Sequence, residues 1–137
     1  MSDRAPTVVR FLNPASMPQS VGYTQVVEVT GSKMLYLAGQ VAINPAGQIV
    51  GVGDLHAQTQ QVFENLKAGL GAAGATFEQV VKLHLYLLDI TQIQIVRDVR
   101  DRYVNTQFPP ASTAVEVRRL FRDELLIEID LIAALPA

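Results

Sequence analysis

The C-terminal segment from Leu125 to Ala133 restricts the fold most, because its residues alternate between two chemical classes. Every second residue is apolar, as expected for the buried face of a β-strand. The residues between them include two carboxylates, Glu128 and Asp130, which stand between Leu126 and Ile132. A carboxylate buried at mid-strand without a partner costs several kcal/mol. This second face therefore either pairs its charges or lines a cleft, and we assign Glu128 to a cleft.

Another strand, from Ser112 to Arg118, is predicted just before this one, across a short charged turn. Pro109 and Pro110 precede it, remove two backbone donors and favour an extended start. The alternation of a strand places Ser112 and Ala114 on the same face. Together the two strands hold most of the chemistry that the chain offers.

Two helical patterns lie upstream. The first is an apolar stripe from Leu55 to Leu70, with Asp54 as the N-cap. The second follows Asp89, and its residues divide into an inward and an outward set. The inward set is Ile95, Val96, Val99 and Tyr103, and the outward set is Arg97, Arg100, Asp101 and Arg102.

Further strand patterns cover residues 8–12, 23–30, 33–43 and 81–88. Gly31-Ser32 between the second and third patterns predicts a hairpin, and Gly39 inside the third predicts a bulge or a close approach. Two helices for about six strands predict one two-layer α+β domain over residues 1–137, with both helices on one sheet face.

The opposite sheet face needs a second cover. We expect it to carry Leu126, Ile132, Ala114, Tyr86 and Leu88. Because the chain supplies no third helix, another subunit is the expected cover. A hydrophobic fraction of 49% agrees with apolar surface of this kind.

Composition argues against several classes of function. The chain has no cysteine, so disulfides and thiolate chemistry are excluded. No apolar run approaches the roughly 20 residues of a membrane span, and Met1–Thr7 has no apolar core of a signal peptide. A net charge of −2 argues against a general nucleic-acid binder. The small basic cluster of Arg118, Arg119 and Arg122 is balanced by the neighbouring carboxylates of Asp123 and Glu124. We expect a cytoplasmic protein that binds neither membrane nor nucleic acid.

The polar candidates in the strands each have a plain structural alternative. His84 shares a strand face with Tyr86, so it belongs either to a cleft or to an ordinary subunit interface. Ser112 as a nucleophile would need a base, and the only histidines are His84 and His56. Two histidines in separate elements, without cysteine, predict no metal site, and no cofactor is expected.

Several stretches carry a resemblance to a known family. They are Phe108–Val117 (FPPASTAVEV), Ile127–Asp130 (IEID), Gly22–Gln25 (GYTQ), Leu37–Val41 (LAGQV), Gln60–Leu66 (QQVFENL) and Ala75–Glu78 (ATFE). In this order the sequence resembles the RidA/YjgF family of enamine/imine deaminases. The resemblance implies a chorismate-mutase-like α+β fold, a homotrimer whose sheets form a central barrel, and three small-molecule clefts between subunits.

The family's motif P-A-R-S-x-V-E-V assigns roles by position. Its arginine clamps the substrate carboxylate, a following strand's glutamate orients the attacking water, a backbone amide binds the carboxylate or carbonyl, and an N-terminal tyrosine closes the cleft. By this resemblance the glutamate is Glu128, the amide belongs to Ala114 and the tyrosine is Tyr23. Tyr23 and Tyr86 are also candidate apolar walls of the cleft.

The arginine position of the motif holds Ser112. A hydroxyl cannot form a charged bidentate contact, and losing such a contact costs about 2–5 kcal/mol. Arg118 shares the face of Ser112 but lies roughly 20 Å along the strand, and Arg119 points to the other face. An arginine of an adjacent subunit, Arg10 for example, stays open as a replacement.

Three functions remain. The first is a diverged enzyme that hydrolyses a small carbonyl, imine or enamine compound with a water held by Glu128. The missing clamp then predicts little activity on 2-iminopropanoate. The second is a trimeric ligand-binding or regulatory module without turnover. The third, an endoribonuclease or translation inhibitor, is disfavoured by the acidic chain.

Overall fold

The computed structural model describes residues 7–137, so the expectation about a signal peptide rests mainly on Met1–Pro6, outside the described residues. The strands are β1 (Val8–Leu12), β2 (Val26–Thr30), β3 (Ser32–Gln40), β4 (Val80–Leu87), β5 (Ala111–Glu116) and β6 (Ile127–Pro136). The helices are α1 (Leu55–Ala72) and α2 (Ile93–Arg100), and the 3-10 turns are η1 (Phe77–Gln79) and η2 (Ile90–Gln92). Six strands and two helices confirm the predicted α+β class.

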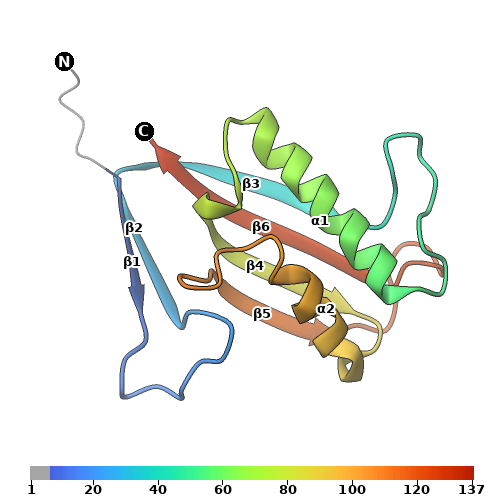
Figure 1. Ribbon diagram of the computed structural model, residues 1–137, viewed down its shortest axis with the longest axis horizontal. Helices are drawn as coiled ribbons and strands as arrows, with labels where there is room; N and C mark the ends of the chain where they lie inside the picture. The colour runs from blue at the N-terminus through green and yellow to red at the C-terminus, as the bar shows by residue number, and fades with distance from the viewer. Residues whose placement is uncertain (1–6) are drawn as a thin grey trace.

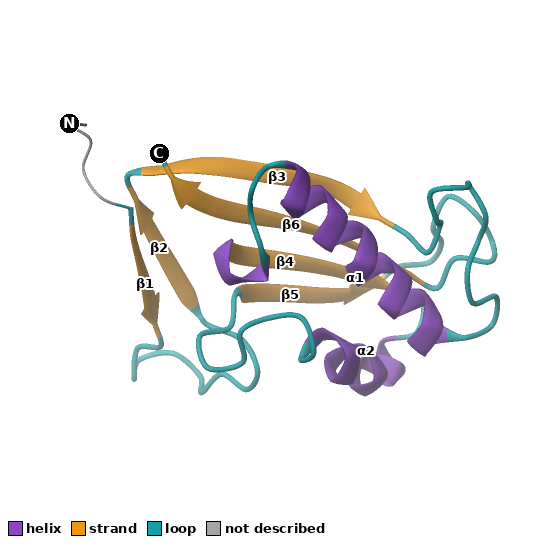
Figure 2. Cartoon of the chain, turned by 45° about the horizontal axis from the view of Figure 1, so that its top comes forward, coloured by secondary structure: helices purple, strands orange, loops and turns teal. Residues whose placement is uncertain are grey.

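The strands form a four-stranded sheet, in the order β3-β6-β4-β5, and a separate ribbon of β1 and β2 (Figure 1). Within the larger sheet β4 and β5 run parallel, and β6 is antiparallel to both β3 and β4. Both helices lie over the same face of this sheet, which confirms the two-layer prediction (Figure 2). The opposite face carries no helix of the described chain, and we call it the open face.

The predicted hairpin between residues 23–30 and 33–43 is wrong. β2 pairs with β1, with Val29 opposite Val9, whereas β3 pairs with β6, with Leu37 opposite Leu131. Only Gly31, at φ 66°, separates the ends of the two strands, and a hairpin loop normally has two residues. The chain therefore turns out of the ribbon at this glycine and enters the larger sheet.

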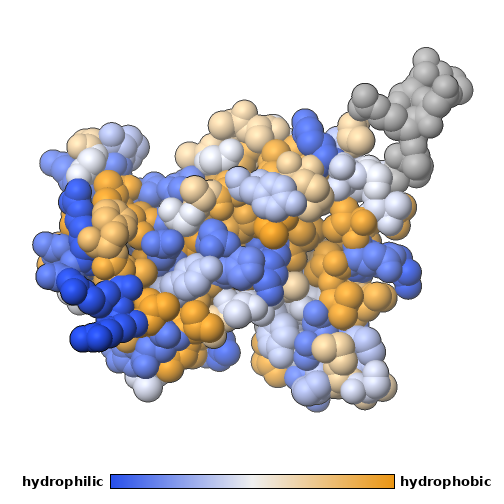
Figure 3. Space-filling model, turned by 180° about the vertical axis from the view of Figure 1, so that it is seen from behind, coloured by the Kyte–Doolittle hydropathy of each residue, from blue (hydrophilic) through white to orange (hydrophobic). Residues whose placement is uncertain are grey.

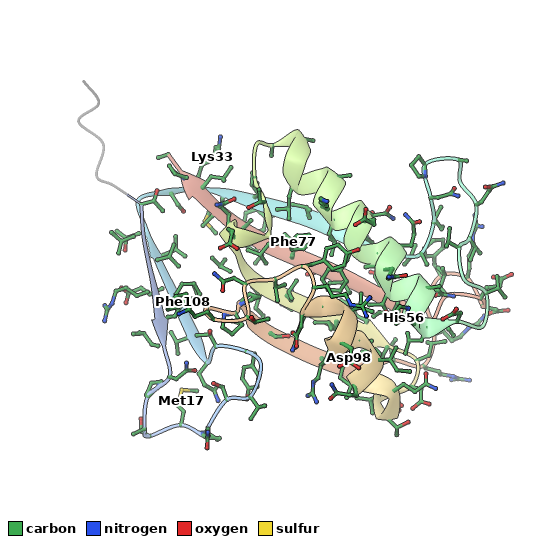
Figure 4. The ribbon with its side chains drawn as sticks, viewed as in Figure 1. Met17, Lys33, His56, Phe77, Asp98 and Phe108 are labelled. Carbon is green, nitrogen blue, oxygen red and sulfur yellow. The ribbon has the colours of Figure 1, made fainter. Side chains whose placement is uncertain are left out.

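The core lies between the helices and the sheet. On α1, Phe63 is fully buried and stacks on Tyr103, with ring centroids 5.0 Å apart, and Phe77 completes the aromatic cluster at 5.8 Å from Phe63 (Figure 4). The predicted start of α1 is confirmed, because the Asp54 carboxylate accepts a hydrogen bond from the Ala57 N–H at 3.0 Å. These contacts fix the helix layer against the sheet.

Candidate functional site

A small cavity opens between β4, β5, α2 and the loop before β2. Its volume is ≈ 130 Å³, well under the roughly 300 Å³ at which drug-sized pockets begin. The lining side chains are Val21, Tyr23, Leu85, Ile93, Arg97, Arg100, Ser112 and Ala114. The cavity therefore joins three of the residues singled out in the sequence, Tyr23, Ser112 and Ala114.

The loop that brings Tyr23 to this cavity is tied to the start of β5. The Thr24 N–H donates to the Pro110 carbonyl at 3.2 Å, and the Thr24 hydroxyl donates to the Pro109 carbonyl. Thr24 is itself buried, at 2% exposed. The two prolines, which have no N–H of their own, thus use their carbonyls to hold the loop across the cavity.

The strand register places Ser112 and Ala114 on the helix-covered face. Ser112 stands beside Leu83, and Ala114 stands beside Leu85, both of which point into the core. The prediction that Ala114 shares the open face with Tyr86 is therefore wrong. Period-two alternation showed that Ser112 and Ala114 lie together, but only the parallel pairing of β5 with β4 decides which face they share.

The other predicted site residues lie on the open face. Glu128 of β6 stands opposite Tyr86 of β4, and Asp130 stands opposite His84. His84 Nδ1 and Asp130 Oδ1 are 2.6 Å apart, and the Tyr86 hydroxyl donates to Asp130 Oδ2 at 3.1 Å. Burial raises the pKa of Tyr86, and the acceptor carboxylate of Asp130 and the charge of Glu128 raise it further. Asp130 is thus the paired carboxylate of β6.

Glu128 occupies space that a glycine leaves free. The β3–β6 pairing shifts register between Leu37 and Gln40, which confirms the irregularity predicted at Gly39. A Cβ added to Gly39 would overlap the Glu128 carboxylate and lie 2.8 Å from its Cδ. The missing side chain on β3 therefore determines where the half-buried carboxylate of Glu128 can rest.

Two residues of the cavity were missed in the sequence. Arg97 and Arg100 were assigned to the outward side of their helix, but both line the cavity, and Arg100 is only 7% exposed. The Arg100 Nε and Nη2 atoms both lie 2.9 Å from Asp101 Oδ1, and a Cβ added to Gly22 would come within 2.9 Å of Nη2. Their i, i+3 spacing, which places two side chains on one side of a helix, was the available signal.

Other kinds of site find little support. Within residues 7–137 no three His, Asp or Glu side chains gather as metal ligands would. No helix in the same range is both long and apolar enough to cross a membrane. His56 lies exposed at the start of α1 and does not line the cavity (Figure 4).

Comparison with known proteins identifies the family. The sequence model described as Endoribonuclease L-PSP matches residues 14–135, nearly the whole chain. A RutC family protein of Pyrococcus horikoshii is 42% identical over 118 residues, which are 85% of this chain and 90% of the relative. The chain belongs to the RidA/YjgF family.

Other members of the family agree in sequence and in structure. A crystal structure of the Rid family protein YyfB from Yersinia pestis has a TM-score of 0.85 and 38% identity, covering 93% of this chain and 98% of that one. A Capra hircus protein named 2-iminobutanoate/2-iminopropanoate deaminase is 36% identical over 115 residues, 82% of this chain and 81% of the relative. With these neighbours the chorismate-mutase-like fold of the RidA/YjgF family is confirmed.

Proposed function

We propose that this chain is a hydrolase of small carbonyl, imine or enamine compounds, acting in clefts between the subunits of a homotrimer. Water adds to the imine carbon, the carbon–nitrogen bond breaks, and ammonia leaves an oxo compound. Glu128 accepts a proton from the attacking water and returns it to the leaving nitrogen. Family membership and the deaminase name of one relative support this reaction class.

One observation carries the assignment to a shared cleft. The cavity with Tyr23, Ser112 and Ala114 lies on the helix side of the sheet, whereas Glu128 lies on the open face. A single chain holds these groups on opposite sides of one sheet. They act together only where the open face of one copy meets the cavity of a neighbouring copy, as a ring of subunits allows.

The exposed apolar side chains of the open face support the same assembly. Tyr36 of β3 is 73% exposed, Met34 is 39% exposed and Val115 of β5 is 41% exposed. Seen from behind, apolar patches and polar side chains are mixed across this surface (Figure 3). A face of this composition is typical of one that is covered in an oligomer.

Ammonia release from imines generated in place by an oxidase tests the reaction. The panel combines imines of amino acids with imines of simple amines, and each rate is corrected for spontaneous hydrolysis. We expect the wild type to accelerate release and Glu128→Gln to lose about 10²–10⁴-fold, as for removal of a general base. Glu124→Gln, an exposed carboxylate of the turn before β6, is the matched control and keeps the full rate.

A second function, a trimeric ligand-binding or regulatory module without turnover, is favoured by Ser112 in place of the motif arginine. A wild type that stays folded and binds small ligands, yet releases no ammonia above the spontaneous rate, would establish this second function. Full activity of Glu128→Gln would contradict the proposed role of Glu128. Ribonuclease activity, which the name of the family model suggests, is excluded if no RNA cleavage survives repurification at high salt.

A further inference from the structure

Two arginines line the cavity in which the motif arginine is missing. Arg97 and Arg100 come from the last turn of α2, and Ser112 faces them from β5 across a space of ≈ 130 Å³. We propose that Arg97 is the specificity-determining residue of this site and binds a carboxylate of the ligand, with Arg100 fixed behind it as a positioning residue. Only the statement that this ligand is a substrate rests on the proposed function.

The two arginines differ in whether a neighbouring carboxylate already neutralises their charge. Arg100 is buried, and Asp101 binds it through both Nε and Nη2 at 2.9 Å. Gly22 of the loop that carries Tyr23 lies beside the same guanidinium, since a Cβ added to this glycine would come within 2.9 Å of Arg100 Nη2. Its charge is largely neutralised, and its place is fixed by the fold.

Arg97 keeps its charge available. It is exposed, and none of the ion pairs found in residues 7–137 includes it. A planar guanidinium with free donors binds a carboxylate through two parallel hydrogen bonds. The low-polarity wall beside it strengthens such a contact relative to bulk water.

Ser112 favours this arrangement by its small size. A serine on β5 leaves room in the cavity that a long side chain would fill, and its hydroxyl can donate one more hydrogen bond to an anion. The rest of the wall is apolar, because Leu85, Ile93 and Val21 line it. The cavity therefore suits a ligand with one carboxylate and a short aliphatic chain, such as a small 2-oxo or 2-imino acid.

Binding measured by ligand-observed NMR tests the assignment without requiring turnover. The probes are 2-oxobutanoate, its neutral amide 2-oxobutanamide, and inorganic phosphate. We expect the wild type to bind 2-oxobutanoate, and Arg97→Gln to weaken that binding by about 10- to 100-fold, as expected for loss of a charged hydrogen bond. Arg102→Gln, which removes an exposed arginine near the end of α2 that does not line the cavity, changes it by less than twofold.

Several outcomes would overturn the assignment. One is equal binding of 2-oxobutanoate by Arg97→Gln and the wild type, and another is equal binding of the neutral amide and the acid. Phosphate binding as tight as that of 2-oxobutanoate would make this a general anion site. Tighter binding of 2-oxobutanoate by Ser112→Arg than by the wild type would mean that a cation was missing. We expect the opposite, because a third guanidinium crowds the cavity.

Failure of this inference is distinguishable from failure of the proposed function. The same titrations on Glu128→Gln report binding where hydrolysis is lost, and Arg97-dependent binding there supports the inference by itself. Arg97-dependent binding in a wild type that releases no ammonia would overturn the proposed function and keep the inference. If the wild type releases ammonia but binds 2-oxobutanoate equally well without Arg97, the inference about Arg97 is overturned and the proposed function is kept.

Discussion

The two faces of the four-stranded sheet come from the same strands but depend on different partners. On the helix-covered face Leu83, Leu87, Ile127 and Ile129 are fully buried by residues of the same chain. On the open face the half-buried carboxylates stand beside side chains as exposed as Tyr36, at 73%. One face is complete within the chain, whereas the other has the composition of an interface.

This difference explains why the candidate site is divided. The helix side supplies a small cavity, which is lined by two arginines of α2 and by Ser112 and Ala114 of β5. The open side supplies Glu128, because the glycine at the β3 bulge leaves room for a carboxylate. The groups proposed for ligand binding and for proton transfer therefore lie on different faces of the sheet, and we expect them to meet only between copies.

The largest expected effect is on the complete face. Phe63→Ala removes a fully buried ring that stacks on Tyr103, and we expect it to lower the free energy of unfolding by about 3–5 kcal/mol. Tyr36→Ala on the open face should lower it by less than about 0.5 kcal/mol in a dilute, unassociated chain. Chemical denaturation over a range of protein concentrations measures both values.

The concentration series decides what covers the open face. If copies of this chain cover the open face, the loss of unfolding free energy caused by Tyr36→Ala increases with protein concentration. Most of the loss caused by Phe63→Ala is then independent of protein concentration. A cost of Tyr36→Ala that matches that of Phe63→Ala in the dilute chain would show that the two faces are not different in kind. Sedimentation velocity on the same samples reports the oligomeric state directly.

Much of the fold was predictable because local chemistry determined it. The alternation of β4 and β6 and the Asp54 cap of α1 both hold in the structure. Each of these depends on residues within a few positions of one another. The motifs that carried the family resemblance lie between Gly22 and Asp130, within the residues 14–135 that the family model matches.

The wrong predictions concern contacts between distant segments. The partner of β2 depends on a one-residue turn at Gly31, and the face of Ala114 depends on the register between β5 and β4. Arg100 was placed outward because arginines are mostly exposed, yet it lines the cavity, where it pairs with Asp101 and lies beside Gly22. Alternation identifies which residues share a face, but only tertiary pairing decides what that face contacts.

A smaller effect is expected at the bulge that positions Glu128. Gly39→Ala places a methyl group where the carboxylate rests, so we expect a loss of about 1 kcal/mol in unfolding free energy and displacement of Glu128. Gly71→Ala in α1 meets no atom within 4 Å and should instead add about 0.5–1 kcal/mol. Denaturation curves of both variants, together with Glu128→Ala, form a double-mutant cycle.

The cycle separates the carboxylate from the backbone. If Glu128 alone resists the new methyl group, Gly39→Ala costs almost nothing once Glu128 is alanine. An unchanged cost in the double variant would show that the strand backbone, not the carboxylate, needs the glycine. Gly39→Ala should also lose ammonia release to the same extent as Glu128→Gln, because the displaced carboxylate no longer reaches the water.

The last comparison takes one tyrosine from each side of the sheet, since each donates its hydroxyl to a carboxylate. Burial, with Glu64 as the acceptor at 2.9 Å, raises the pKa of Tyr103 to about 12, and the pKa of Tyr86 is raised beside Asp130. A tyrosine whose pKa is raised on folding stabilises the fold below its unfolded pKa near 10, and this contribution is lost as the pH rises through the folded pKa. Tyr103→Phe should therefore cost about 1 kcal/mol at neutral pH and reduce the loss of stability between pH 10 and 12.

Absorbance of the tyrosinate band during alkaline titration follows the ionisation of the tyrosines. Comparing the wild type with Tyr103→Phe and with Tyr86→Phe assigns one transition to each of these two residues. The transition near pH 12 should disappear only in Tyr103→Phe, at every protein concentration, because Tyr103 belongs to the face that the chain completes itself. The transition lost in Tyr86→Phe should move to higher pH as copies associate, because covering the open face buries that phenol further. A Tyr86 transition that does not depend on concentration while the chain associates would place the subunit contact elsewhere, and Glu128 would then lie too far from any neighbouring cavity to share it.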